Sequence, residues 1–236
     1  MKKTFLLYIL TAAMQYACAA HFSVPPAIDP FVYAAPEAAH DAMYGFPAVR
    51  IWGWSKDGKA AYSTECGIEG RGGMILQYCI YDFTRDTIIA AITIDSFDYT
   101  IEEAGDAMIF ALYAAKKDEI QTLMRIHAIA PQETPFLPFP IQKDKKQYTY
   151  TIDIEYEDTP EFYDTIKKYT VSITTDGKRK TIKTAADVSA LNVYCCGYFI
   201  SPLKNWAVII LAEERWGFEG TELVYGFSGC NLNTDF

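Results

Sequence analysis

Three acidic side chains form the arrangement in this sequence that comes closest to known chemistry. Asp153, Glu155 and Glu157 alternate with apolar residues, so they share one face of a predicted strand. Two carboxyl groups that face each other across a cleft hydrolyse glycosidic bonds, and calcium takes about 6–8 oxygen ligands. The composition leaves a two-carboxylate glycosidase open as an alternative, whereas the row lacks the glycine-punctuated spacing of familiar calcium loops; a solvated strand face accounts for the row without any ligand. We therefore predict a solvated face.

Nucleophilic and metal-based chemistry has few candidate residues. The three histidines, His21, His40 and His127, lie in separate regions. A Ser-His-Asp triad needs a histidine beside its serine, and a histidine zinc site needs several together. Residues 226–229 have the wrong spacing for the Gly-x-Ser-x-Gly elbow of serine hydrolases. The sequence thus predicts no catalytic, cofactor-binding or metal-ligating residue, and no cofactor.

Five cysteines follow residue 19, and their spacings contain no Cys-x-x-Cys motif. Cys66 and Cys79 could cross a hairpin as a disulfide, and buried free thiols are the alternative. Cys195 and Cys196 should point to opposite faces of a strand because side chains alternate. The odd number leaves at least one thiol free or paired with another chain.

Aromatic residues are the feature of this sequence that favours a binding function. Trp216, Phe218 and Glu219 lie in a glycine-flanked segment, where burial is less automatic than in a strand. Aromatic residues in exposed loops are typical of binding sites for proteins or carbohydrates. We predict these three residues as an interaction loop, with ordinary packing as the alternative. Trp52 and Trp54 are two residues apart and should share one strand face.

The elements that carry these residues are predicted to be mostly β, with one central helical segment (α+β). Residues 1–19 are predicted as a secretory signal, and residues 20–47 as an irregular leader rich in alanine and proline. Residues 48–236 should form a single domain of antiparallel, blade-like sheets in an incomplete propeller-like or sandwich arrangement. Within it, the helical segment should span about residues 100–129, followed by a proline-rich linker over residues 130–140.

Helix and hairpin signals predict several boundaries. Residues 100–103, Thr-Ile-Glu-Glu, match a capping box, and residues 116–118 are expected to break the helix in two. Asp57-Gly58 and Asp176-Gly177 indicate tight hairpin turns, because glycine tolerates the positive φ that such turns need. Separate strands are predicted at residues 178–184 and 192–200.

Two segments of the sequence resemble each other. Residues 54–62 read Trp-Ser-Lys-Asp-Gly-Lys-Ala-Ala-Tyr and are followed by Glu65 and an Ile-Glu-Gly loop. Residues 200–208 read Ile-Ser-Pro-Leu-Lys-Asn-Trp-Ala-Val and are followed by Glu213 and a Phe-Glu-Gly loop. Both predict strand, tight turn, strand and glycine loop. We interpret them as copies of one degenerate repeat, with chance similarity of two hairpins as the alternative.

The first copy resembles the Trp-Ser-x-Asp-Gly-Lys signature of TolB-type and other WD40-like propeller blades. In those blades the serine and aspartate cap a turn between inner strands. The second copy departs from the signature at residues 202–205. Because a propeller needs at least about four blades, two copies cannot close one. The resemblance implies blade-like sheets without a complete propeller.

Most of the chain after residue 19 is also similar to an uncharacterised family of bacterial predicted secreted proteins. The similarity rests on residues 53–59, the central helix, residues 212–220 and the Gly-Cys-Asn-Leu-Asn run at residues 229–233. These motifs are short and of low specificity. The resemblance brings no known activity, cofactor or catalytic residue.

Export is the prediction with the most direct support in the sequence. Lys2 and Lys3 precede the apolar run at residues 5–10 and the small residues before Ala19-Ala20, as in cleavable secretory signals. The run is too short for a membrane-spanning helix, which needs about 20 residues. We predict a periplasmic or extracellular protein with no integral membrane span after cleavage. A lipoprotein anchored at Cys18 and an uncleaved anchor are the alternatives.

Charge narrows the choice of partners. The chain has 21 basic and 30 acidic residues, a formal charge of −9, and cleavage of the signal removes two of the lysines. Nucleic acids and anionic membranes bind clustered lysine and arginine, and no cluster here exceeds residues 178–180. We therefore expect no nucleic acid as partner, and favour another envelope protein.

Three functions remain compatible with these features. The first is a non-enzymatic cell-envelope module that binds another protein. The second is a carboxylate-based hydrolase acting on envelope carbohydrate, which requires two carboxyls about 5–9.5 Å apart across a cleft. The third is a structural domain of a larger assembly, which predicts an exposed apolar or edge-strand patch with no concave pocket.

Overall fold

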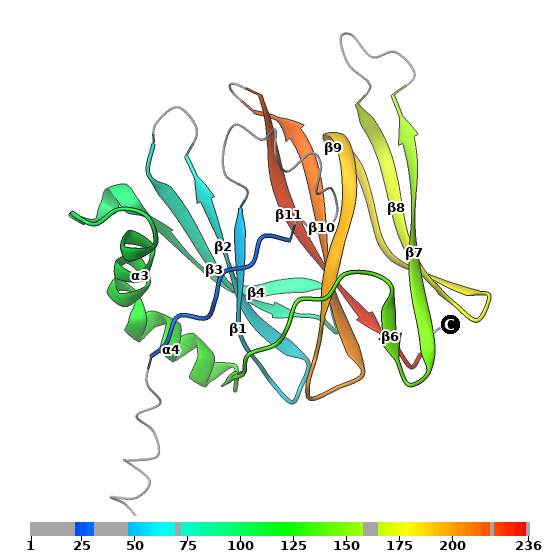
Figure 1. The fold of residues 1–236 in the computed structure, drawn as a ribbon, viewed down its shortest axis with the longest axis horizontal. Coiled ribbons are helices and arrows are strands. Elements are labelled where there is room, and N and C mark those ends of the chain that lie inside the picture. The colour runs from blue at the N-terminus through cyan, green and yellow to red at the C-terminus, as the bar shows by residue number, and fades with distance from the viewer. Residues whose placement is uncertain (1–21, 31–46, 69–71, 158–164, 218–219, 235–236) are drawn as a thin grey trace, which may run out of the picture.

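The computed structural model describes residues 22–30, 47–68, 72–157, 165–217 and 220–234. These residues form two antiparallel sheets and two helices (Figure 1). The predicted mostly-β α+β class, with antiparallel sheets in an incomplete propeller-like arrangement, is therefore confirmed. No helix in these ranges is long and apolar enough to cross a membrane.

The first sheet is a meander of consecutive hairpins with one short added strand. Its order is β4-β3-β2-β1-β5, and its paired strands are antiparallel. The strands are β1 (Ala48–Trp54), β2 (Lys59–Gly67), β3 (Met74–Asp82), β4 (Thr87–Asp95) and β5 (Ala130–Pro131). The predicted Asp57-Gly58 turn joins β1 to β2, with Gly58 at a φ of +100°.

The second sheet is curled and has the order β11-β10-β9-β8-β7-β6 (Figure 1). Its strands are β6 (Ile141–Lys143), β7 (Lys146–Tyr156), β8 (Ile166–Thr175), β9 (Lys178–Ile200), β10 (Trp206–Trp216) and β11 (Thr221–Asn231). The Asp176-Gly177 turn joins β8 to β9, as predicted. The prediction of two separate strands within β9 is wrong. Asp187 and Ser189 take positive φ there, and the pairing of β9 with β8 and β10 shifts register around them. The strand nevertheless continues through these residues as one element.

Two short helices cover the outer face of the first sheet (Figure 1). They are α3 (Asp106–Ala115) and α4 (Lys117–Ile126), and the 3-10 turn η2 (Ser96–Asp98) precedes them. The expected break is confirmed at Lys116, where α3 ends and α4 begins. The predicted capping box at residues 100–103 is wrong. Gly105, with φ 60°, interrupts the chain before the first helical turn, so α3 begins only at Asp106.

Buried side chains of the described residues form three clusters, one for each packed layer. The cluster between the two sheets includes Trp54 and Phe199. A second cluster, which includes Tyr169, lies on the opposite face of the six-stranded sheet. The third, between the first sheet and the helices, includes Tyr78 and Tyr113. The first sheet is therefore buried on both faces, by the second sheet and by the helices.

A bulge in β1 separates two tryptophans that were predicted to share a face. The register with β2 shifts between Ile51 and Gly53, and Gly53 takes a φ of +156°. Trp52 consequently packs in the cluster under the helices, and Trp54 packs in the cluster between the sheets. The prediction that both lie on one face is wrong, because the bulge changes the side-chain alternation.

Candidate functional site

The outer edge of β4 is the part of the described chain best suited to binding. β4 ends the five-stranded sheet, and no other strand in the described ranges pairs with its outer side. From Thr87 to Ile94 it contains neither a charged residue nor a proline. Proteins usually protect an edge strand with charges, proline or a covering segment, because its free N–H and C=O groups can pair with another chain.

Apolar side chains are exposed at both ends of this strand. The exposed fractions are 49% for Ile88 and 37% for Ile89, near the start of β4. Near its end, Ile75 of β3 and Phe97 of η2 are exposed to 37% and 50%. Soluble proteins carry many single exposed apolar residues, but here they border an open strand edge.

A bulge divides β4 into two parts. The register with β3 shifts between Ile80 and Tyr81, which leaves Ile89 without a partner residue in β3. Thr87 and Ile88 pair with β3 before the bulge, and Ala90 to Asp95 pair with it in regular order after the bulge. This regular part keeps the backbone groups of the outer edge in the alternating pattern that an antiparallel partner needs.

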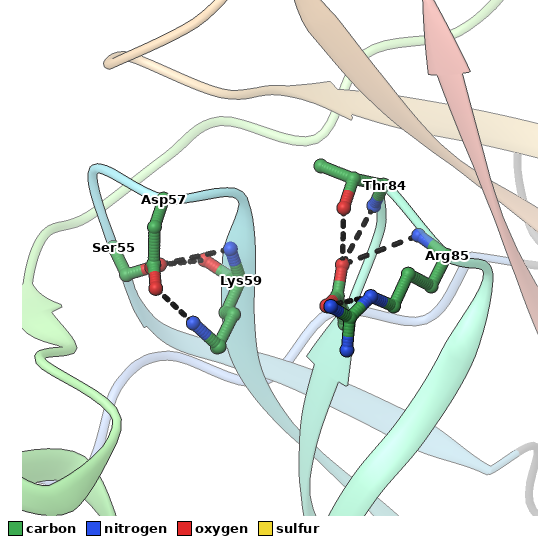
Figure 2. A network of polar contacts seen from close by, with 6 residues as sticks. Ser55, Asp57, Lys59, Thr84 and Arg85 are labelled. Carbon is green, nitrogen blue, oxygen red and sulfur yellow. Dashed lines mark hydrogen bonds and ion pairs between the residues drawn. The ribbon is translucent and has the colours of Figure 1, made fainter.

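A hydrogen-bonded turn fixes the start of β4 (Figure 2). The Asp82 carboxylate accepts bonds from the backbone N–H and the hydroxyl of Thr84, at 3.0 and 2.6 Å, and from the backbone N–H of Arg85, at 3.2 Å. Burial raises the pKa of Asp82, but the bonds from Thr84 and Arg85 outweigh burial, so this pKa lies below its usual value. The turn is therefore held by an ionised carboxylate.

The Ser-x-Asp-Gly-Lys turn lies beside the Asp82 turn (Figure 2). The backbone N–H of Lys59 donates to the Ser55 hydroxyl at 2.8 Å, and that hydroxyl donates to the Asp57 carboxylate at 2.5 Å. The Lys59 ammonium group pairs with the same carboxylate. Hydrogen bonds from Lys59 and Ser55 lower the pKa of Asp57 to about 2.

Contacts between the two turns explain the glycine of this motif. The Gly58 carbonyl accepts a hydrogen bond from the backbone N–H of Phe83 at 3.1 Å. A Cβ on Gly58 would lie 2.4 Å from the methyl carbon of Thr84. The motif that resembles propeller blades thus supports the hairpin from which β4 starts.

The predicted interaction loop falls partly within the described ranges. Phe218 and Glu219 lie outside them. Trp216 is the last residue of β10, and 47% of it is exposed. It belongs to the second sheet, so the structure places it and β4 on different sheets.

The acidic row on β7 and the residue that follows it is a solvated face, as predicted. Asp153, Glu155 and Glu157 are all exposed. Asp153 pairs with Arg179, and Glu155 pairs with Lys167 at 3.2 Å. Surface pairs of this kind contribute little to stability and require no ligand.

Two adjacent carboxylates on β10 have separate partners. Glu213 accepts a hydrogen bond from the Tyr169 hydroxyl at 2.6 Å and pairs with Arg215. Glu214 accepts bonds from the Tyr194 hydroxyl at 3.0 Å and from the Asn192 amide at 2.8 Å. Neighbouring residues of a strand point to opposite faces. These carboxyls therefore do not face each other as a two-carboxylate hydrolase requires.

The five cysteines within the described ranges are free thiols, and the Cys66–Cys79 disulfide is not formed. In the β2–β3 register Cys66 lies opposite Ile75, and Cys79 lies opposite Tyr62. The offset of four residues separates the two cysteines by about 13 Å along the strands, whereas disulfides join Cα atoms about 4.4–6.8 Å apart. The opposite orientation of Cys195 and Cys196 is confirmed, because they lie in different clusters.

A buried ion pair on the first sheet was not predicted. Arg50 and Glu65 are each 3% exposed and form a salt bridge between β1 and β2. The Tyr113 hydroxyl of α3 donates to Glu65 at 2.8 Å, and Arg50 donates to the Pro25 carbonyl. The network joins sheet, helix and leader. A charged residue inside the apolar Ala-Val-Arg-Ile-Trp run of β1 was the signal for it.

No three His, Cys, Asp or Glu side chains gather as metal ligands within the part of the chain that the structure describes. No protein-family model, curated protein or solved structure matches the chain. The candidate site therefore rests on its geometry alone.

Proposed function

We propose that this protein is an exported, non-enzymatic binding module that captures an extended segment of another envelope protein on the outer edge of β4. The observation that carries the proposal is an edge strand that has no charged residue from Thr87 to Ile94 and exposes two isoleucines. In strand addition, backbone hydrogen bonds provide affinity and alternate side chains provide specificity. The regular part of β4, from Ala90 to Asp95, is long enough for several such bonds.

The partner segment should be apolar in its centre and basic at its ends. The centre would lie against the uncharged residues Thr87 to Ile94, where an unpaired charge would lose hydration with no compensation. The chain as a whole has a formal charge of −9, which attracts basic residues that flank the paired segment. Export remains part of the proposal, since residues 1–19 lie outside the described ranges.

A synthetic peptide can test strand addition directly. Its centre alternates valine and threonine, its ends are lysine pairs, and it carries a fluorescent label. We expect saturable binding by fluorescence anisotropy, together with slower hydrogen exchange of the amides in β4. The control peptide has the same sequence with every backbone nitrogen of its centre methylated, and it should not bind because neither of its edges can then donate to β4.

A pair of matched variants locates the binding. Ile89 and Val224 are both 37% exposed, but they lie on the edge strands of different sheets. A lysine on an edge strand disfavours pairing with another strand. Ile89→Lys should therefore weaken peptide binding at least tenfold, whereas Val224→Lys should leave it unchanged. Equal binding by both variants, or binding of the methylated peptide, would contradict the proposal. A stable dimer that Ile89→Lys dissociates would assign the edge to a second copy of the chain instead.

A further inference from the structure

A cavity of about 270 Å³ lies at one end of the curled sheet. The hydroxyl of Tyr148 in β7 donates a hydrogen bond of 2.9 Å to the carbonyl of Leu232, which follows β11. The sheet is thus curled so far that β7, near one edge, comes close to the residues that follow β11 at the other edge. The lining residues are Asp144, Lys146, Tyr148, Thr175, Asp176, Lys178, Leu232 and Asn233. Mouths of curled or closed sheets are frequent ligand sites.

The cavity has a buried floor and an exposed rim. Tyr148, Thr175 and Leu232 are only 3%, 4% and 3% exposed. At the rim, the side chains of Lys146 and Asp176 are 52% and 66% exposed and lie 3.6 Å apart as an ion pair. A ligand that enters between the exposed Lys146 and Asp176 side chains would meet a mostly polar lining, to which Tyr148 and Leu232 add a smaller apolar part.

One polar atom on the floor has no partner. The Thr175 hydroxyl is buried and makes no hydrogen bond with any described residue. Thr175 is on the same face of β8 as Val171 and Ile173, which point into the concave side of the sheet. A buried hydroxyl without a partner is unfavourable, and native proteins contain few of them. A bound group that hydrogen-bonds Thr175 would remove this cost.

The charges around the cavity favour a neutral ligand. Two aspartates and two lysines line it, so their formal charges cancel. A phosphate would meet two carboxylates, and a metal cation would meet two ammonium groups. A sugar hydroxyl both donates and accepts, so it can pair with carboxylate, ammonium, amide and hydroxyl groups alike. The Tyr148 ring and Leu232 offer apolar contact for the C–H groups of a sugar ring.

We propose that this cavity binds one neutral, hydroxyl-rich ring, such as a monosaccharide unit, with Thr175 as a hydrogen-bonding partner. Its volume lies just below the range of about 300–1,000 Å³ for drug-sized ligands, which suits a single ring. Burial, together with the charges of Asp144 and Asp176, raises the pKa of Tyr148, so its hydroxyl stays protonated. The proposal goes beyond strand capture and does not depend on it, because β4 belongs to the other sheet.

Titration of the purified protein with simple sugars tests this site. The probes are glucose, galactose, mannose, N-acetylglucosamine and myo-inositol, with inorganic phosphate and calcium chloride as charged controls. We expect at least one sugar to shift the NMR signals of Tyr148 and Thr175 in a saturable way. Saturable shifts with phosphate or calcium alone, or with none of the probes, would overturn the proposal.

Two threonine variants distinguish the site from non-specific binding. Thr175→Val keeps the side-chain shape and removes the hydroxyl, and Thr174→Val is the control because Thr174 points to the opposite face. Thr175→Val should weaken sugar binding about tenfold, as for loss of one hydrogen bond of about 1.4 kcal/mol. Without sugar, it should raise the melting temperature by a few degrees, because an unpaired buried hydroxyl is removed. Equal sugar affinity in both variants would overturn the assignment of Thr175.

The sugar could belong to a free glycan or to a lipid headgroup, and a second arm separates these sources. The sugar that binds is presented on neutral phosphatidylcholine vesicles as a glycolipid and, separately, as a soluble oligosaccharide. Binding to either form at the site that Thr175→Val weakens supports the proposal and identifies the source. Binding to vesicles that lack the sugar would contradict it.

Discussion

The Asp86 carboxylate accepts a hydrogen bond of 2.9 Å from the backbone N–H of Gly229, and this bond joins the two sheets. Asp86 lies in the turn that begins β4, and Gly229 lies in β11. The Tyr81 hydroxyl also donates to Asp86, and it lies 3.3 Å from the Phe227 carbonyl of β11. The hairpin that presents β4 is therefore bound at its base to the second sheet, while no strand in the described part of the chain pairs with its outer edge.

Gly229→Ala should destabilise the protein markedly. A Cβ at residue 229 would lie 2.0 Å from the Phe83 carbonyl oxygen, a contact that requires backbone movement. We expect a loss of at least about 1–3 kcal/mol in the free energy of unfolding, measured by urea denaturation. Gly226→Ala is the control in the same strand, because a Cβ there meets nothing within 4 Å. Equal stability of the two variants would show that this contact between the sheets is absent.

Acid should weaken the turn at Asp82. A carboxyl whose pKa is lowered in the folded state stabilises the protein above its unfolded pKa, near 3.8. That contribution is lost as pH falls from about 4 through the lowered folded pKa. Urea denaturation between pH 7 and pH 2 should therefore show a smaller acid-induced loss in Asp82→Asn than in the unsubstituted protein.

Removing one partner of the buried Arg50–Glu65 pair should be costly. Arg50→Met leaves the Glu65 carboxylate buried without its cation, and we expect a loss of about 3–5 kcal/mol in the free energy of unfolding. The double variant Arg50→Met/Glu65→Leu should recover a large part of this loss. By contrast, Arg179→Met breaks an exposed pair and should cost less than about 1 kcal/mol. A single and a double variant of equal stability would argue against a charged pair.

The thiols should be unreactive in the native protein. Burial raises the pKa of Cys196 to about 12, with the Asp29 carboxylate adding to it, and burial raises that of Cys230 to about 11. The thiolate is the form that reacts with disulfide reagents. At pH 8 an aromatic disulfide reagent should therefore react with Cys196 and Cys230 only after the protein is unfolded. Unfolding without reductant should release all five thiols from Cys66 to Cys230. A count of three would indicate a disulfide.

Local signals allowed part of this fold to be predicted. The turns at Asp57-Gly58 and Asp176-Gly177 follow from the positive φ that glycine accepts, and they form as expected. The helix break around Lys116 and the alternating burial of β7 were also evident from short stretches of sequence. In each case the residues that decide the structure are neighbours in the chain.

Features that depend on distant contacts were missed. The offset between Cys66 and Cys79 is set by the register of β2 with β3, which neither residue reveals. Whether the strand from Thr87 to Ile94 lies at a sheet edge depends on the order of all the other strands. The unpaired hydroxyl of Thr175 depends on how the curled sheet brings β7 close to residues after β11.

The bulge at Gly53 gives this protein two separate optical reporters within three residues. The Trp52 indole donates to the Ser63 hydroxyl at 2.9 Å beneath the helices, and the Trp54 indole donates to Thr134 at 2.7 Å. Indole emission depends on the local surroundings, so a variant that retains only Trp52 would report on detachment of the helices. A variant that retains only Trp54 would report on separation of the sheets. One glycine thus makes the order in which the layers come apart accessible to fluorescence.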